Sequence, residues 1–154
     1  MRKNFVIPTY LLLAVSLLAP VVSFAAPPSS ATMQYGSPNH GSGCNFPCQD
    51  DASFHSVDRI IPGAVAISTG GSVTFHVDGF HQVAIYALGT TAKDIEPNPA
   101  AFPFVEDPVG RLALGGVGSD LTFTFDQPGK YLVICNIAPH FEESNMWGWV
   151  QVTQ

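Results

Sequence analysis

The sequence is poor in basic side chains. Its 154 residues include 6 Lys and Arg against 12 Asp and Glu, which gives a formal net charge of −6. A protein that binds a nucleic-acid backbone or an anionic membrane surface needs positive charge for that contact. The composition therefore argues against both kinds of partner.

Helical patterns and common catalytic motifs are also missing. No segment has the apolar spacing of an amphipathic helix, and no internal repeat is visible. The Gly-x-Ser-x-Gly elbow, the Walker loop and the dinucleotide-binding fingerprint do not occur. With 46% hydrophobic residues, 14 Gly and 13 Pro, the composition fits one compact domain.

The one long apolar stretch lies at the N-terminus. Arg2 and Lys3 precede a stretch from Tyr10 to Val22, and small residues follow at Ser23 and Ala25. This pattern predicts a secretory signal peptide over residues 1–25. The stretch is shorter than the roughly 20 apolar residues of a membrane span, and no cysteine follows for a lipid anchor. We expect a periplasmic or secreted protein with no membrane anchor after cleavage.

The mature chain is predicted to be strongly acidic. Loss of residues 1–25 removes two of the six basic residues and none of the 12 acidic ones, which leaves a net charge of −8. Residues 26–43 are rich in Pro, Ser and Gly, which predicts a flexible leader. We expect the folded domain to span residues 44–154.

Short runs of β-branched and aromatic residues, separated by turn signals, follow in the domain. Residues 73–77 and 121–125 alternate strictly between apolar and polar side chains, which is typical of half-buried antiparallel strands. The pattern predicts an all-β fold, a Greek-key β-sandwich. Residues 90–118 are expected to form a long crossing loop with one short strand at 111–114. The other expected strands cover residues 64–68, 82–88, 131–135 and 147–152.

Candidate metal ligands cluster near the C-terminus. Cys135, His140 and Met146 follow one another as Cys-x4-His-x5-Met, with the cysteine at the end of one expected strand and the methionine at the start of the next. His81 stands at the head of a third expected strand. Two imidazoles, a thiolate and a thioether are the donor set of a trigonal blue copper site.

These residues carry a resemblance to the cupredoxins, the plastocyanin and azurin family of type 1 copper proteins. The resemblance covers roughly residues 57–153 and rests on one early histidine in Phe80-His81-Gln82-Val83, followed by the late Cys135, His140 and Met146. It implies a sandwich with one type 1 copper ion at one end. The implied function is an electron carrier, not an enzyme, that moves single electrons through Cu(I) and Cu(II).

Two positions depart from the family pattern. Gln82 stands where the family commonly has an asparagine whose amide ties the ligand loops together. The five residues between His140 and Met146 form a longer spacing than in the simplest members. Glu142 or Glu143 is therefore an alternative axial ligand, and its carboxylate would stabilise Cu(II). If Glu142 displaces Met146, the protein would be a small copper enzyme with an open coordination position.

A second constellation is Cys44-x3-Cys48. In an exported chain the two cysteines most simply form a disulfide. Alternatively, Cys44 and Cys48 hold copper together with His40. Through this pair, or through the cupredoxin site itself, the protein would then bind copper in the periplasm for delivery to another protein. His55 and His76 are expected to be solvent-facing residues without a functional role.

The surface around His140 is expected to contact redox partners. Pro139 and Phe141 flank this histidine and Phe80 precedes His81, which predicts an apolar patch around a partly exposed imidazole edge. An acidic carrier attracts a basic partner such as a c-type cytochrome, and an oxidase is a further candidate. We expect a monomer.

Overall fold

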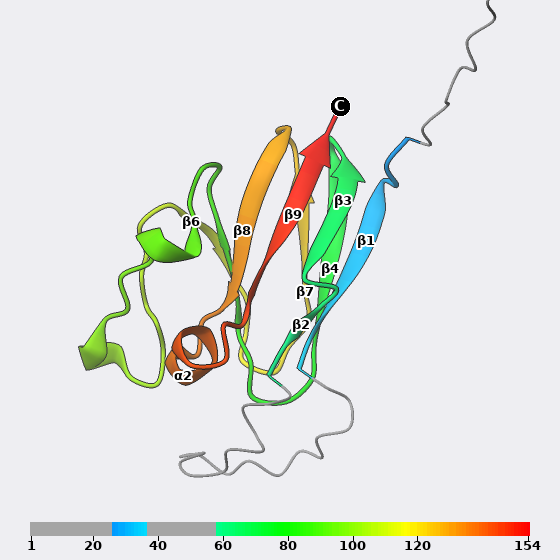
Figure 1. The fold of residues 1–154 in the computed structure, drawn as a ribbon. Helices are drawn as coiled ribbons and strands as arrows, with labels where there is room; N and C mark the ends of the chain where they lie inside the picture. The colour runs from blue at the N-terminus through cyan, green and yellow to red at the C-terminus, as the bar shows by residue number, and fades with distance from the viewer. Residues whose placement is uncertain (1–25, 37–57) are drawn as a thin grey trace, which may run out of the picture.

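The structure is a computed structural model, and it describes residues 26–36 and 58–154. Two β-sheets make up the described part of the chain (Figure 1). One sheet has the strand order β2-β1-β4-β7 and the other has the order β3-β9-β8-β5-β6. The strands are β1 (Ser30–Tyr35), β2 (Ile60–Ile61), β3 (Ala64–Ser68), β4 (Gly71–Val77), β5 (Val83–Tyr86), β6 (Arg111–Leu114), β7 (Leu121–Phe125), β8 (Gly129–Cys135) and β9 (Trp147–Thr153).

Two strand pairs are parallel, β1 with β4 and β3 with β9, and the other pairs are antiparallel. Figure 1 shows β3, β9 and β8 side by side in one layer. The predicted all-β sandwich is confirmed. The strand expected at residues 111–114 is confirmed as β6.

Alternating side chains build the core as predicted. In β4, Val73, Phe75 and Val77 are buried while His76 is exposed. The exposed His76 ring lies 2.8 Å from a carboxylate oxygen of Asp120, through its Nδ1 atom. His76 is thus a surface residue of the sheet, as expected.

The expected flexible leader is wrong for residues 30–35. These residues form β1, which lies between β2 and β4 in the first sheet. Met33 and Tyr35 are fully buried, and Ala31 packs against the same core. The alternation of Ala31, Met33 and Tyr35 between polar residues explains the strand, because it places three apolar side chains on one face. The domain therefore begins before Cys44.

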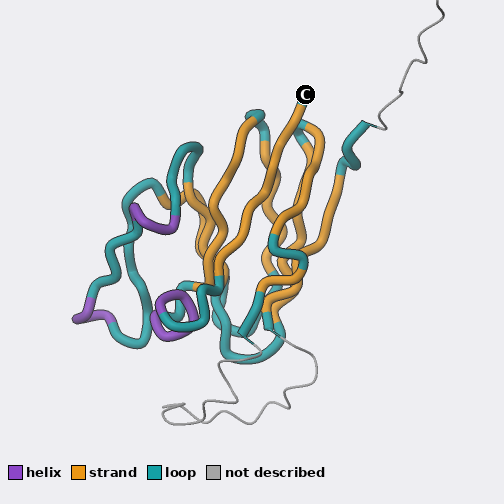
Figure 2. Tube along the Cα trace, in the orientation of Figure 1, coloured by secondary structure: helices purple, strands orange, loops and turns teal. Residues whose placement is uncertain are grey.

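The long crossing segment between β5 and β7 holds two short 3-10 helices, η1 (Ala92–Asp94) and η2 (Pro99–Ala101). Figure 2 shows this segment as an arm beside the strands. The Asp107 carboxylate accepts hydrogen bonds from the backbone N–H groups of Glu96 at 3.1 Å and Val109 at 2.8 Å. These bonds tie two distant parts of the arm together.

One short α-helix, α2 (Ala138–Glu142), lies between β8 and β9. Within the described ranges no helix is long and apolar enough to cross a membrane. The expected signal peptide at residues 1–25 lies outside these ranges.

Candidate metal centre

Three elements bring the predicted donors together at one end of the sandwich. His81 lies two residues before β5, Cys135 is the last residue of β8, and His140 lies in α2. Strands β5 and β8 are antiparallel, with Val83 opposite Cys135. This register places the early histidine beside the late cysteine. Figure 1 shows α2 at the end of β8, away from the C-terminus.

The donor atoms of these residues form a small triangle. The Cys135 Sγ atom lies 3.6 Å from His81 Nδ1 and 3.7 Å from His140 Nδ1. The two Nδ1 atoms are 3.0 Å apart. All three side chains are buried, with 3% of His81, 0% of Cys135 and 3% of His140 exposed. Among the described residues, these three form the cluster suited to a metal ion.

The triangle has the size that a metal ion requires. A point equidistant from three atoms with these separations lies about 2.0 Å from each of them, close to the metal–nitrogen and metal–sulfur lengths of about 2.0 to 2.3 Å found in zinc sites. One thiolate and two imidazoles suit copper through the soft sulfur and the imidazole nitrogens. The residues present therefore fit a copper ion.

Met146 is placed beside this triangle by backbone hydrogen bonds. Its N–H donates to the His140 carbonyl at 2.9 Å, and its carbonyl accepts from the Cys135 N–H at 2.9 Å. The side chain is 1% exposed and belongs to the same core cluster as Cys135. Glu142 and Glu143, the alternative axial ligands, are exposed. Burial therefore favours the thioether over either carboxylate.

The helix α2 was missed from the sequence although it carries one of the donors. Pro139 stands in its first turn, a position where the missing N–H of proline is tolerated and its fixed φ is favourable. The N–H of Phe141 donates to the carbonyl of Ile137 at 3.0 Å. Five residues are too few to show a helical period, so the sequence signal for this helix was Pro139 at its start.

Gln82 makes the link between loops that the family assigns to asparagine. Its side-chain carbonyl accepts from Asn136 Nδ2 at 2.8 Å, and its Nε2 donates to the Gly115 carbonyl at 2.9 Å. The Asn136 N–H also donates to the Gln82 carbonyl at 2.6 Å. The residues that follow His81 and Cys135 are therefore held together by both backbone and side-chain bonds.

Burial sets the protonation of the metal-free donors. It lowers the pKa of His81 from 6.5 to about 4, and the nearby Asp78 carboxylate opposes this shift. Burial also raises the pKa of the Cys135 thiol from 9.0 to about 12, although the backbone N–H groups of Gln82 and Ile137 act in the opposite direction. At neutral pH His81 is neutral and ready to bind a metal, while Cys135 must first lose a proton.

Sequence reasoning missed Asp58, which touches both histidines. Its Oδ1 atom lies 3.6 Å from His81 Nε2, and its Oδ2 atom lies 3.5 Å from His140 Nε2. The residue is 3% exposed. Asp58 stands 23 residues before His81 and belongs to no spacing motif, so nothing in the sequence pointed to it.

Gly36 is a second missed neighbour of the site. Its φ of +86° lies in the left-handed region, and a Cβ atom at this position would lie 2.7 Å from His81 Nε2. The absence of a side chain therefore leaves the space that the His81 ring occupies.

Several predicted residues lie outside the described ranges, namely Cys44 and Cys48 of the expected disulfide, His40 and His55. Within those ranges Cys135 is the free cysteine.

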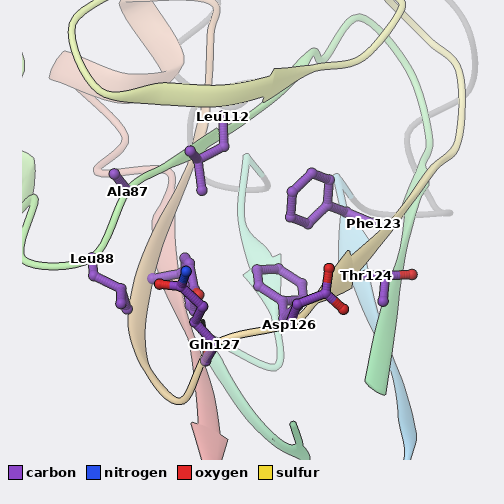
Figure 3. Close-up of a pocket in the computed structure, with 9 residues that line it drawn as sticks. Ala87, Leu88, Leu112, Phe123, Thr124, Asp126 and Gln127 are labelled. Carbon is purple, nitrogen blue, oxygen red and sulfur yellow. Dashed lines mark hydrogen bonds between the residues drawn. The ribbon is translucent and has the colours of Figure 1, made fainter. Parts of the chain in front are cut away.

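A surface pocket of about 350 Å³ lies apart from the donors (Figure 3). Leu112, Phe123 and Gln127 are among its lining residues, which come from β6, β7 and the turn before β8. Cys135 stands at the other end of β8. The pocket lining includes none of the three donors, so it does not belong to the candidate metal centre.

No protein-family model matches the chain, and no curated protein matches it in sequence. Solved structures do match the chain. Reduced auracyanin from the photosynthetic bacterium Roseiflexus castenholzii matches with a TM-score of 0.54 at 19% identity, over 84% of this chain and 100% of that one. Auracyanin A, a "blue" copper protein from Chloroflexus aurantiacus, matches with a TM-score of 0.50 at 20% identity, over 80% and 99%.

Auracyanin B matches with a TM-score of 0.51 at 19% identity, over 85% of this chain and 94% of that one. These neighbours are cupredoxins, and the chain has the cupredoxin fold, as its sequence predicted. Its His81, Cys135 and His140 triangle fits a type 1 copper site. At such identities the neighbours show the fold alone, so the chemistry depends on the donor atoms.

Proposed function

We propose that this protein is an exported type 1 copper protein that carries single electrons between redox partners. One copper ion is held by His81 Nδ1, Cys135 Sγ and His140 Nδ1, with the thioether of Met146 as the weak axial ligand. The observation that supports this most strongly is the triangle of buried donor atoms, whose sides of 3.0, 3.6 and 3.7 Å suit one metal ion.

Copper in such a site supplies one-electron chemistry by alternating between Cu(I) and Cu(II). The chain keeps the donors in place during this change. Cys135 ends a central strand of its sheet, and the bonds between Gln82 and Asn136 hold the segments that follow His81 and Cys135. Little rearrangement then accompanies each electron transfer.

The proposed partner surface differs from the one expected. His140 is 3% exposed, so the prediction of a partly exposed imidazole edge is wrong. Pro139, beside it in α2, is half-buried, and Trp147, next to Met146, is 36% exposed. We place the redox contact over this end of the sandwich. A mature chain with a net charge of −8 favours a basic partner such as a c-type cytochrome, or an oxidase with a basic docking face.

Export rests on the apolar segment of residues 1–25, whose cleavage leaves a periplasmic or secreted protein. We propose that the protein is a monomeric electron carrier and not an enzyme.

The test is the visible absorption and electron paramagnetic resonance spectrum of residues 26–154 loaded with Cu(II). An intense blue band with narrow copper hyperfine splitting, lost in Cys135→Ser, is expected. His76→Ala is the matched control, because His76 lies on the exposed face of β4, and its spectrum should equal that of the wild type. A pale spectrum that is the same in Cys135→Ser would exclude the proposed site.

A further inference from the structure

The Asp58 carboxylate lies against the outer nitrogens of both candidate histidine ligands. Each of its two oxygens faces one ring, Oδ1 at 3.6 Å from His81 Nε2 and Oδ2 at 3.5 Å from His140 Nε2. The side chains of all three residues are buried, with exposed fractions of 3 to 4%. The two rings thus present their Nδ1 atoms to Cys135 and their Nε2 atoms to one carboxylate.

This arrangement matches what a metal-binding histidine requires. A neutral imidazole that binds a metal through Nδ1 carries its proton on Nε2, and that buried N–H needs an acceptor. A carboxylate partner on the outer nitrogen fixes the tautomer and the orientation of the ring. The distances of 3.5 and 3.6 Å are longer than a hydrogen bond, so the contacts in this structure are electrostatic.

We infer that Asp58 is a positioning residue that holds both histidine ligands through their Nε2 atoms and adds one buried negative charge to the metal centre. This inference rests on the proposed copper function.

The added charge has a redox consequence. The negative charge of the Asp58 carboxylate, which lies against both histidine ligands, stabilises Cu(II) more than Cu(I), because Cu(II) carries the larger positive charge. Asp58 therefore favours the oxidised state and lowers the reduction potential of the centre.

The variant Asp58→Asn tests both roles. The amide has the same shape as the carboxylate but only one oxygen that accepts, so its NH₂ group must face one of the two Nε2–H groups. Asp78→Asn is the control, because it removes a half-buried charge that also acts on His81.

Voltammetry of the copper-loaded proteins should show a more positive potential for Asp58→Asn. We expect the reduction equilibrium constant to rise at least about tenfold, which is about 59 mV for one electron. Asp78→Asn should give a clearly smaller shift. Equal shifts in the two variants would mean a general effect of nearby charge and would overturn the inference.

A copper-independent measurement separates this inference from the proposed function. In Zn(II)-loaded wild-type protein, the nitrogen-15 NMR spectrum of the imidazoles should show two Nε2–H protons that exchange slowly with water. One of them should exchange at least about tenfold faster in Asp58→Asn, because an amide NH₂ group then faces it in place of a carboxylate oxygen. Unchanged exchange in the variant would overturn the positioning role.

If Asp58→Asn does not fold, the spectrum of the Zn(II)-loaded wild type tests the positioning role by itself. A proton on Nδ1 of either histidine, or fast exchange at either Nε2, would contradict that role. If instead Cu(II) gives no blue band in the wild type, the proposed function fails while the NMR result for Asp58 stands.

Discussion

The Nδ1 atoms of His81 and His140 lie 3.0 Å apart although 59 residues separate them in the chain. Two neutral imidazoles that both carry their proton on Nε2 would turn lone pairs toward each other at this distance. A cation between the two atoms relieves that repulsion. The two nitrogens are therefore close enough to bind one metal ion together.

Metal binding should raise the stability of the folded protein. Because the three donors come together in the folded chain, a metal that binds only this state stabilises it by about 4 kcal/mol at a thousand times its dissociation constant. Thermal unfolding with Cu(II), compared with protein treated with a chelator, measures this gain. His81→Ala should abolish it, whereas His76→Ala should retain it. An equal gain in His81→Ala would place the binding elsewhere.

The metal-free protein should lose stability in mild acid. The unfolded chain binds a proton at His81 near pH 6.5, whereas burial lowers the pKa of this group to about 4 in the folded protein. The contribution of neutral His81 is therefore present above pH 6.5 and is lost as pH falls to about 4. It amounts to roughly 3 kcal/mol. Urea unfolding at a series of pH values should show a flatter dependence in His81→Gln, and an equally steep one would contradict the assignment.

Substitution of Met146 by leucine should change the redox potential without unfolding the protein. The two side chains have similar volumes, so the free energy of unfolding should change by less than about 1.5 kcal/mol. Loss of the thioether removes a donor that helps the more highly charged Cu(II), so the potential should rise. Met33→Leu is the matched control, because Met33 is also fully buried in the same core. Voltammetry that gave the same potential for both variants would argue against an axial role.

A methyl group at Gly36 should disturb His81. Its Cβ would contact the ring at 2.7 Å and would also meet the Asp78 carbonyl oxygen. Gly36→Ala should therefore weaken copper binding and lower stability beyond the roughly 1 to 2 kcal/mol cost of the left-handed backbone.

Gly70→Ala isolates the backbone cost, because Gly70 has a φ of +77° and no atom lies within 4 Å of the position that its Cβ would take. Copper titration and urea unfolding should show normal copper affinity in Gly70→Ala. Similar losses of copper affinity in the two variants would mean that the ring contact is unimportant.

The strands and the candidate donor set could be predicted from the sequence because both depend on local patterns. Alternation identified β4 and β7, and the order His81, Cys135, His140 and Met146 predicted the candidate donors, of which the structure brings His81, Cys135 and His140 together. The strand β1 was not predicted because its alternating apolar residues stand within a segment rich in Pro, Ser and Gly. Its partner β4 lies about 40 residues away, and that parallel pairing leaves no local signal.

The contact of Asp58 with the two histidines could not be predicted from local sequence patterns. A carboxylate can reach two histidine rings only after β5, β8 and α2 have brought those rings together. The contact arises from three-dimensional packing, so no residue spacing in the sequence predicts it. Gly36 is similar, because the need for glycine comes from a ring 45 residues later in the chain.

The pairing of β5 with β8 also joins donors from distant parts of the chain. Cys135 and His140 are five residues apart, whereas His81 is 54 residues from Cys135. An ion that met the unfolded chain would find two donors within one short loop and would have to close a long loop to reach the third, at an entropic cost. In the folded chain the pairing of β5 with β8 closes this loop, because it places Val83 opposite Cys135 and so brings His81 beside Cys135.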